Sequence, residues 1–312
     1  MHPDDLMPHL DLDALVDPHL VAPPPVEVLP GARSHLHLRY AVVQGWRPLQ
    51  LDLHLPAVPG EEGRPWPVVV HVHGGSFLAG VPAMGPWVTL PARGVAVASV
   101  SYRLAGEAPF PAAVEDVRAA VAWVADNADR FGLDPGRVAL WGSSAGGYLA
   151  ALVGITGADP VGRPVGGLSR PDPSPWPRVA AVVAQHPVTD PAALRADAEH
   201  TTPDEVDALE AVMARFFDQT SPAPTALEAH LARRREAGHD VPPFLVAHGD
   251  ADRRVGLGQS RRLIDALHAH GVPAELVVVP GADHGAPEFS AEPLVARVLD
   301  FLTSRWDRGG AP

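Results

Sequence analysis

The sequence predicts an α/β protein, a three-layer sandwich built on a mostly parallel sheet of about eight strands. Short, nearly continuous apolar runs that end in Gly, Ser, His or Asp recur along the chain, as in parallel strands that are covered on both faces. Segments with helical periodicity separate these runs. Two segments of alternating apolar and polar residues precede them, and this alternation is typical of half-buried antiparallel strands.

The N-terminal segment predicts an arm and a linker that precede the fold. Residues 21–31, "VAPPPVEVLPG", are rich in proline and form a stiff, extended segment. We therefore expect residues 1–30 to be an arm and linker, and residues 31–312 to form one domain.

The predicted strands follow in order. The alternating strands are "SHLHLRYAVV" and "LQLDLHLP", which we expect at the antiparallel edge of the sheet. The apolar strands are "PVVVHVHGG", "VAVASVSY", "RVALWGSS", "VAAVVAQHP", "PFLVAHGD" and "AELVVVPG". Helices are predicted at 111–130, where valines recur at helical spacing, and in the amphipathic segments 257–271 and 292–306.

One segment, at about residues 190–240, interrupts the alternation because it contains no strand-like run. Residues 203–218 and 224–238 have helical patterns. An insertion between two core strands at the carboxyl edge of the sheet is where a cap over a site would lie. We expect a helical cap there, with His230 on its surface.

Composition excludes several classes of function. The formal net charge is −13, which disfavours a nucleic acid or an anionic membrane as partner. The chain has no cysteine and all 24 basic residues are arginine, so thiolate chemistry and a lysine Schiff base are excluded. No signal peptide or membrane span is recognisable. We expect a cytoplasmic protein, either a monomer or a homodimer.

Two adjacent serines lie at a tight turn between a predicted strand and a helix of small residues. A nucleophile at such a turn needs small residues two positions before and after it, because the strand and the helix pack closely there. Ser144 has Gly142 and Gly146 at these positions, whereas Ser143 has Trp141 before it. Ser144 is therefore the candidate nucleophile, although a turn that merely ends a strand would show the same glycines.

A second motif follows an earlier strand. Gly74 and Gly75, in "HGGSF", allow backbone N–H groups to approach a substrate oxygen. With the N–H of Ala145 they are the expected oxyanion-hole donors, and His73 is expected to hold the turn. No carboxylate or third histidine accompanies His71 and His73 with ligand spacing, so we expect no metal.

A serine nucleophile also needs a base and an acid that orients the base, on loops after later strands. The strand "PFLVAHG" is followed by Asp250 and Asp252, and the strand "AELVVVPG" is followed by His284. Their order along the chain is serine, acid, histidine, as this kind of site requires.

Together these motifs resemble the α/β-hydrolase serine esterases, within the bacterial carboxylesterases related to hormone-sensitive lipase and to feruloyl-esterase-like (BD-FAE-like) polyester hydrolases. The matching stretches are "HGGSF", "SYRLAGEAPFPAAVEDVRAAVAWV", "GSSAGG", "PPFLVAHGDADRRV" and "GADHG". In the family pattern H-G-x-x-D-x-x-V the acid corresponds to Asp252, with Val255 closing the pattern, and the family histidine corresponds to His284. Asp250 is then expected to shape the loop.

The sequence departs from the family at two positions. Ser76 stands where the common H-G-G-G loop has its third glycine, and Ser143 stands where relatives of hormone-sensitive lipase usually have an acid. Both departures favour the feruloyl-esterase-like branch.

The resemblance implies a serine carboxylesterase that hydrolyses small-molecule esters through an acyl-enzyme, with no cofactor. We expect small or aromatic, uncharged acyl groups to be preferred over long-chain fats, with Phe77 as a substrate contact or simply a core residue. Arg253 and Arg254 either attract a substrate carboxylate or belong to a solvated loop. A peptidase or amidase with the same triad is one alternative, and a non-catalytic ligand-binding receptor is another.

Overall fold

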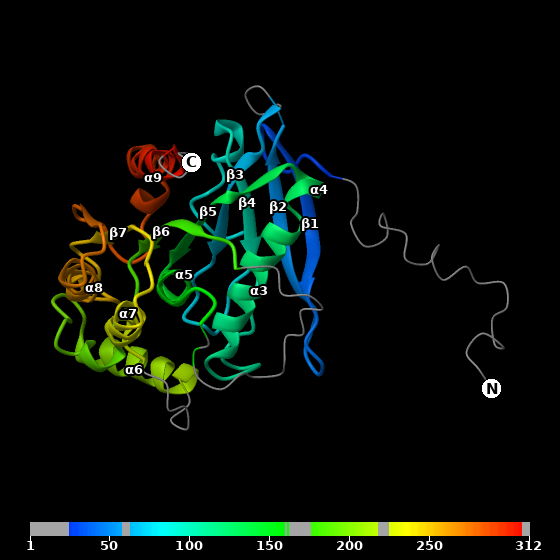
Figure 1. Cartoon of the computed structure of the whole chain (residues 1–312). Helices are drawn as coiled ribbons and strands as arrows, with labels where there is room; N and C mark the ends of the chain where they lie inside the picture. Colours follow the sequence, from blue (N-terminus) through cyan, green and yellow to red (C-terminus); the bar gives the residue numbers. More distant parts are fainter. Residues whose placement is uncertain (1–24, 58–62, 160, 162–175, 218–224, 308–312) are drawn as a thin grey trace, which may run out of the picture.

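The computed structural model describes residues 25–57, 63–159, 161, 176–217 and 225–307. Its centre is an eight-stranded twisted sheet with helices on both faces (Figure 1). The strand order is β1-β2-β4-β3-β5-β6-β7-β8. Strand β2 runs antiparallel to β1 and β4, and all other neighbours are parallel. The predicted three-layer α/β sandwich is confirmed.

Every predicted strand is present. The strands are Ala32–Ala41 (β1), Leu49–Pro56 (β2), Trp66–Val72 (β3), Ala96–Val100 (β4), Leu133–Ser143 (β5), Val179–Gln185 (β6), Phe244–Gly249 (β7) and Ala274–Val279 (β8). Strands β4 and β6 are buried along their whole length, as expected of parallel strands covered on both faces.

Strand β2 differs from the expectation of a half-buried edge strand. It lies between β1 and β4, so both of its edges are paired, and its side chains on both faces are almost all buried, Asp52 and His54 included. The imidazole of His54 hydrogen-bonds the hydroxyl of Ser34 through Nδ1 (2.8 Å), and Asp52 Oδ1 accepts the N–H of His37. Alternating polarity in β2 therefore reflects internal hydrogen bonds and not exposure to water.

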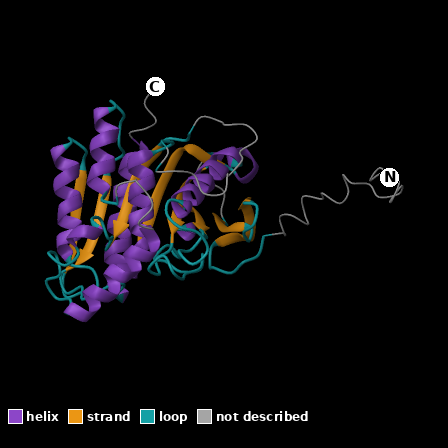
Figure 2. Ribbon diagram, turned by 90° about the horizontal axis from the view of Figure 1, so that it is seen from below, coloured by secondary structure: helices purple, strands orange, loops and turns teal. Residues whose placement is uncertain are grey.

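Helices cover the two faces unequally, as the views in Figures 1 and 2 show. Helices α3, α5, α7 and α8 share one core cluster, whereas α9 packs on the opposite face. The α-helices are Ala112–Asp126 (α3), Ala128–Phe131 (α4), Ala145–Thr156 (α5), Pro203–Phe217 (α6), Leu227–Glu236 (α7), Leu257–Ala269 (α8) and Glu292–Trp306 (α9). Short 3-10 helices lie at Pro91–Arg93, Pro191–Ala193 and Pro287–Ser290.

The predicted cap is smaller than expected. Both helices form, but α7 packs against α5 and α8 within the helical layer. The reason is that the parallel strands β6 and β7 need a crossover helix on the sheet, and α7 provides it. For the same reason His230, on α7, is buried and not on the surface. Of the two helices described in the predicted cap, α6 lies outside that layer and crosses one end of it in Figure 1.

Aromatic side chains attach α6 to the domain. Phe216 on α6 stacks on Phe77, with ring centroids 3.7 Å apart and planes 9° apart. Phe110, Tyr148 and Phe217 make edge or tilted contacts around this pair. Phe77 is 1% exposed and thus belongs to the core.

Candidate active site

The turn between β5 and α5 presents Ser144. Strand β5 ends at Ser143 and α5 begins at Ala145, which leaves Ser144 at φ +54°. A non-glycine residue in this region costs about 1–3 kcal/mol, which the surrounding packing has to offset. The turn is thus strained at the residue that the sequence identified as the nucleophile.

The glycines on either side of Ser144 are required by close packing. A Cβ atom on Gly142 would lie 2.0 Å from the carbonyl oxygen of Gly146. A Cβ on Gly146 would lie 2.0 Å from the carbonyl oxygen of Val72 on the neighbouring strand. Any larger side chain at either position would force β5, α5 and β3 apart.

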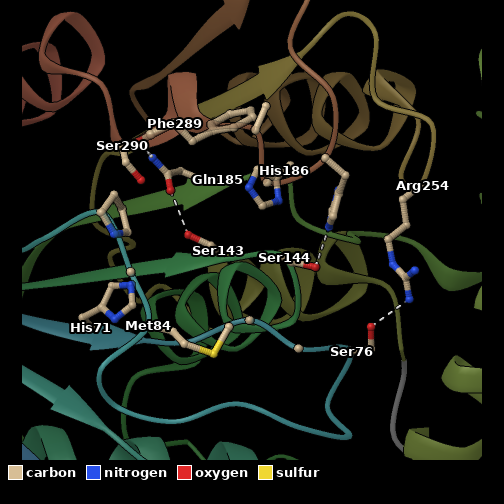
Figure 3. A pocket seen from close by; sticks show the side chains of 17 residues that line it. His71, Ser76, Met84, Ser143, Ser144, Gln185, His186, Arg254, Phe289 and Ser290 are labelled. Carbon is tan, nitrogen blue, oxygen red and sulfur yellow. Dashed lines mark hydrogen bonds between the residues drawn. The ribbon is translucent and has the colours of Figure 1, made fainter.

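Ser144, His284 and Asp252 form a continuous chain of hydrogen bonds. The Oγ of Ser144 lies 2.9 Å from Nε2 of His284, the contact dashed in Figure 3. Nδ1 of the same imidazole lies 2.8 Å from Oδ2 of Asp252. The carboxylate can only accept, so Nδ1 carries the proton and Nε2 offers its lone pair to the serine hydroxyl. This arrangement can take a proton from Ser144 while the carboxylate stabilises the resulting imidazolium.

Asp252 is buried and fully hydrogen-bonded. Its Oδ1 accepts the backbone N–H groups of Arg254 and Val255, each at 2.8 Å. Burial on its own raises the pKa of Asp252, but hydrogen bonds from His248 and His284 outweigh it and hold that pKa below its usual range. The carboxylate therefore stays ionised at neutral pH.

The sequence analysis did not identify His248 as part of the site. This imidazole is fully buried, with Nε2 at 2.8 Å from the carbonyl oxygen of Val255 and 3.2 Å from Asp252 Oδ2. Because a carbonyl only accepts, Nε2 carries the proton, and Nδ1 accepts from Ser260 Oγ at 2.6 Å. The available signal was its place as the first residue of the pattern that contains Asp252.

Asp250 has a different role. Its Oδ1 accepts the N–H of Gly281 at 2.6 Å, and so it ties the loop after β7 to the loop after β8. It has no hydrogen bond to His284 in the structure, in agreement with the expectation that it shapes the loop.

The glycine loop, residues 73–76, lies directly beside the nucleophile. A Cβ on Gly74 would lie 2.9 Å from the carbonyl oxygen of Ser143 and 3.4 Å from Cβ of Ser144. His73 supports the turn, because its Nδ1 lies 2.7 Å from the carbonyl oxygen of Gly74 and its ring stacks on Tyr102. Burial lowers the pKa of His73, so the ring is neutral and Nδ1–H donates.

These elements surround one cavity of about 360 Å³. Ser144, His284, Gly74 and Gly75 all line it. Its remaining walls are His71, Ser76, Met84, Gly85, Pro86, Ser143, Gln185, His186, Arg254, Gly285, Ala286, Phe289 and Ser290. Figure 3 shows Ser144 near its centre. Phe77 does not line this cavity, so the expectation that it contacts the substrate is wrong. Its ring stacks on Phe216 of α6 instead.

Gln185 and His186, at the carboxyl end of β6, are cavity residues that the sequence analysis did not single out. Gln185 Oε1 accepts from Ser143 Oγ at 2.8 Å, and its amide group donates to the carbonyl oxygen of Phe289 at 3.1 Å. The ring of His186 packs edge-on against His284, with centroids 4.4 Å apart. Burial lowers the pKa of His186 well below its usual value, so it adds no charge beside the base. The sequence signal for these two residues was the apolar run "VAAVVAQHP", which ends in polar residues as the other strands of the site do.

Within the described ranges, no three His, Asp or Glu side chains gather as a metal site. In the same part of the chain, no helix has the length and apolar character needed to cross a membrane.

Comparison with known proteins finds one matching family model and relatives that are named as esterases. The BD-FAE family model matches residues 51–267. Esterase LipC of Mycobacterium tuberculosis is 30% identical over 84% of this chain and 64% of its own length. Carboxylesterase NlhH of the same organism is 37% identical over 45% of this chain and 44% of its own length. The chain thus spans less than two thirds of either relative.

Solved structures with the same fold cover most of the chain. A bifunctional GH43-CE protein of Bacteroides eggerthii is 28% identical, with a TM-score of 0.69 over 88% of this chain and 35% of that one. Esterase B of Lactobacillus Rhamnosis (HN001) has a TM-score of 0.70 at 22% identity, over 91% of this chain and 87% of that one.

Proposed function

Because the chain belongs to the BD-FAE family, we propose that it is a serine carboxylesterase that hydrolyses short-chain or aromatic carboxylic esters. The observation that carries the proposal is the chain of hydrogen bonds from Ser144 through His284 to Asp252. The names of the relatives, esterase and carboxylesterase, support an ester as the substrate.

In the proposed reaction, Ser144 Oγ attacks the ester carbonyl and His284 Nε2 takes its proton. His284 then gives that proton to the departing alcohol, which leaves an acyl group on Ser144. Water, deprotonated by the same imidazole, then attacks the acyl carbon. The bond between this carbon and Ser144 Oγ breaks as His284 gives the proton to Ser144 Oγ, which releases the acid and restores the free enzyme. Asp252 holds the imidazole in the required tautomer and stabilises its charged form.

The negative charge on the carbonyl oxygen needs hydrogen-bond donors that are already in place. We assign this role to the backbone N–H groups of Gly74, Gly75 and Ala145. Ala145 is the first residue of α5, where an N–H has no acceptor within the helix. Gly74 and Gly75 line the cavity beside Ser144, which supports their assignment. Removing one such donor typically costs about 10²–10³-fold in kcat.

The size of the cavity supports small acyl groups. At about 360 Å³ it lies at the lower end of the range for small-molecule sites, which is ~300–1,000 Å³. We expect kcat/KM across nitrophenyl esters to be highest for short-chain or aromatic acyl groups. A maximum at long-chain acyl groups, or activation by an emulsion, would contradict this substrate class.

The experiment that tests the proposed nucleophile compares Ser144→Ala with Ser143→Ala. We expect S144A to lose nearly all hydrolysis of a nitrophenyl ester and S143A to keep most of it, because only Ser144 contacts His284. Intact-protein mass spectrometry after treatment with a phosphonate ester should show one adduct, on Ser144. Labelling of Ser143, or no turnover of any ester by the unmodified protein, would refute the proposal. A matched anilide would reveal an amidase instead.

A further inference from the structure

Ser76 is the position where the glycine loop departs from its family, and its backbone is in a conformation that favours glycine. Its φ is +57°, in the left-handed region. A non-glycine residue there costs about 1–3 kcal/mol and persists only where the surroundings enforce it. Serine at this position therefore needs a reason that glycine would not satisfy.

The hydroxyl of Ser76 is hydrogen-bonded to the side chain of Arg254. Nη2 of Arg254 donates to Ser76 Oγ at 2.9 Å, across 178 residues of sequence. Both side chains line the cavity that contains Ser144, and Figure 3 shows the guanidinium at its rim. The backbone of Arg254 is fixed as well, because its N–H donates to Asp252 Oδ1. The Arg254 side chain is thus fixed at its backbone end by Asp252 and at its guanidinium end by Ser76.

Arg254 differs from its neighbour Arg253 in having no anionic partner in the described part of the chain. Arg253 is neutralised by Asp283, with Nε at 2.7 Å from Oδ2 and the backbone N–H at 2.9 Å from Oδ1. For Arg254 the described residues provide a hydroxyl and no carboxylate. Its guanidinium keeps N–H groups with which it can bind an anion in a bidentate manner.

We propose that Arg254 binds a carboxylate carried by the substrate, so that the preferred esters have an acidic group in addition to the ester bond. This inference rests on the proposed esterase function and extends its substrate class beyond the uncharged acyl groups expected from sequence. A protein with a net charge of −13 repels anions over most of its surface. A fixed cation at the cavity rim supplies the local attraction that such a substrate requires.

The test compares esters that differ only in charge. For an acid on the acyl side, 4-nitrophenyl hydrogen glutarate is compared with its primary amide, 4-nitrophenyl 4-carbamoylbutanoate, so that each compound has a single ester bond. For an acid on the alcohol side, the butyrate ester of 3-hydroxybenzoate is compared with that of 3-hydroxybenzamide. In each pair the readout is the ratio of kcat/KM for the acidic ester to that for its neutral counterpart, measured in a pH-stat at low salt.

We expect Arg254→Gln to lower this ratio at least about tenfold for one pair, as loss of a charge-assisted hydrogen bond does. Ser76→Gly should lower it a fewfold without loss of folding, since glycine suits the backbone there. Arg253→Gln is the matched control and should leave the ratio within about twofold. Added salt should lower the wild-type ratio as well, because screening weakens an exposed ion pair.

A ratio that is the same in R254Q and in wild type, for both pairs, would overturn the inference. An equal fall in R253Q would also overturn it, since it would indicate general surface charge. If the neutral esters are hydrolysed in either case, the proposed esterase function stands. If the wild type hydrolyses none of these esters, both the proposed esterase function and the role of Arg254 are contradicted.

Discussion

At the scale of single residues, Asp252 organises the site. Two backbone N–H groups and two imidazoles converge on its carboxylate, which is only 1% exposed. The carboxylate of Asp250, two residues earlier, accepts the N–H of Gly281 and so connects the loops after β7 and β8. Two chemically identical side chains thus have different roles because one faces His284 and the other faces Gly281.

Asp252→Asn should therefore reduce kcat by about 10⁴-fold, because an amide in place of the carboxylate leaves the imidazole in the wrong tautomer. Asp250→Asn should reduce kcat less than about tenfold, since it weakens one loop contact. Steady-state kinetics on a nitrophenyl ester would measure both, with circular dichroism to verify folding. If both variants are folded and D250N is the more severe, Asp252 is not the orienting acid.

At the scale of elements, α6 depends on its aromatic end. Phe216 is 1% exposed and stacks on Phe77, the residue that follows the glycine loop. Val206, Leu209 and Met213 complete the buried side of the helix. The helix is therefore coupled to the loop that borders the cavity through one aromatic pair.

Phe216→Ala should destabilise the protein by about 3–5 kcal/mol if α6 unfolds together with the domain, because it leaves a large cavity. If α6 unfolds separately, the loss should appear as faster amide hydrogen exchange confined to this helix. Ala208→Ser, on the exposed side of α6, is the control and should change the free energy of unfolding by no more than about 0.5 kcal/mol, the difference in helix propensity. Denaturant unfolding and hydrogen exchange that match wild type in F216A would show that the stacked pair does not hold the helix.

At the scale of the whole molecule, several histidines are buried without charge. Burial lowers the pKa of His54 to about 4 and that of His71 to about 3. An unfolded histidine titrates near 6.5. Between these values the unfolded chain binds protons that the folded chain does not, so the free energy of unfolding falls as the pH falls.

Stability should therefore decrease from about pH 6.5 toward pH 4, by up to ~1.4 kcal/mol per pH unit for each such histidine. Paired carboxylates with lowered pKa values, such as Asp252 and Asp283, contribute only at lower pH. Urea unfolding at intervals of half a pH unit would measure the slope. His54→Asn should make it shallower, whereas His239→Asn, at an exposed position, should not. A flat profile between pH 6.5 and 5 would contradict neutral burial.

The site should also work without a metal. Among the described residues, the groups around Ser144 provide no set of three ligands. Prolonged dialysis against EDTA should leave ester hydrolysis unchanged. Reversible loss of activity with recovery on adding a divalent cation would show that a metal takes part.

The sequence by itself predicted the order of the strands and helices along the chain and singled out Ser144 and His284, whereas the choice of Asp252 over Asp250 came from the resemblance to the family pattern. Apolar residues repeat every 2 residues in strands and about every 3.6 in helices, because these periods follow from local backbone geometry. They can therefore be recognised in the sequence alone. The choice of Ser144 over Ser143 followed from the glycines at ±2, because crowding at that turn is also a local property. Parallel strands end at the same edge of a sheet, so residues that follow different strands lie close together there.

Only the tertiary structure decided which way side chains point between elements that are distant in sequence. Phe77 packs on α6 and not in the cavity, and α7 fills the helical layer in place of capping it. His248 supports Asp252, and Arg254 reaches Ser76 across 178 residues. Such contacts depend on how whole elements pack against one another, because a closely packed interior fixes the direction of each side chain. No periodicity along the chain contains that information.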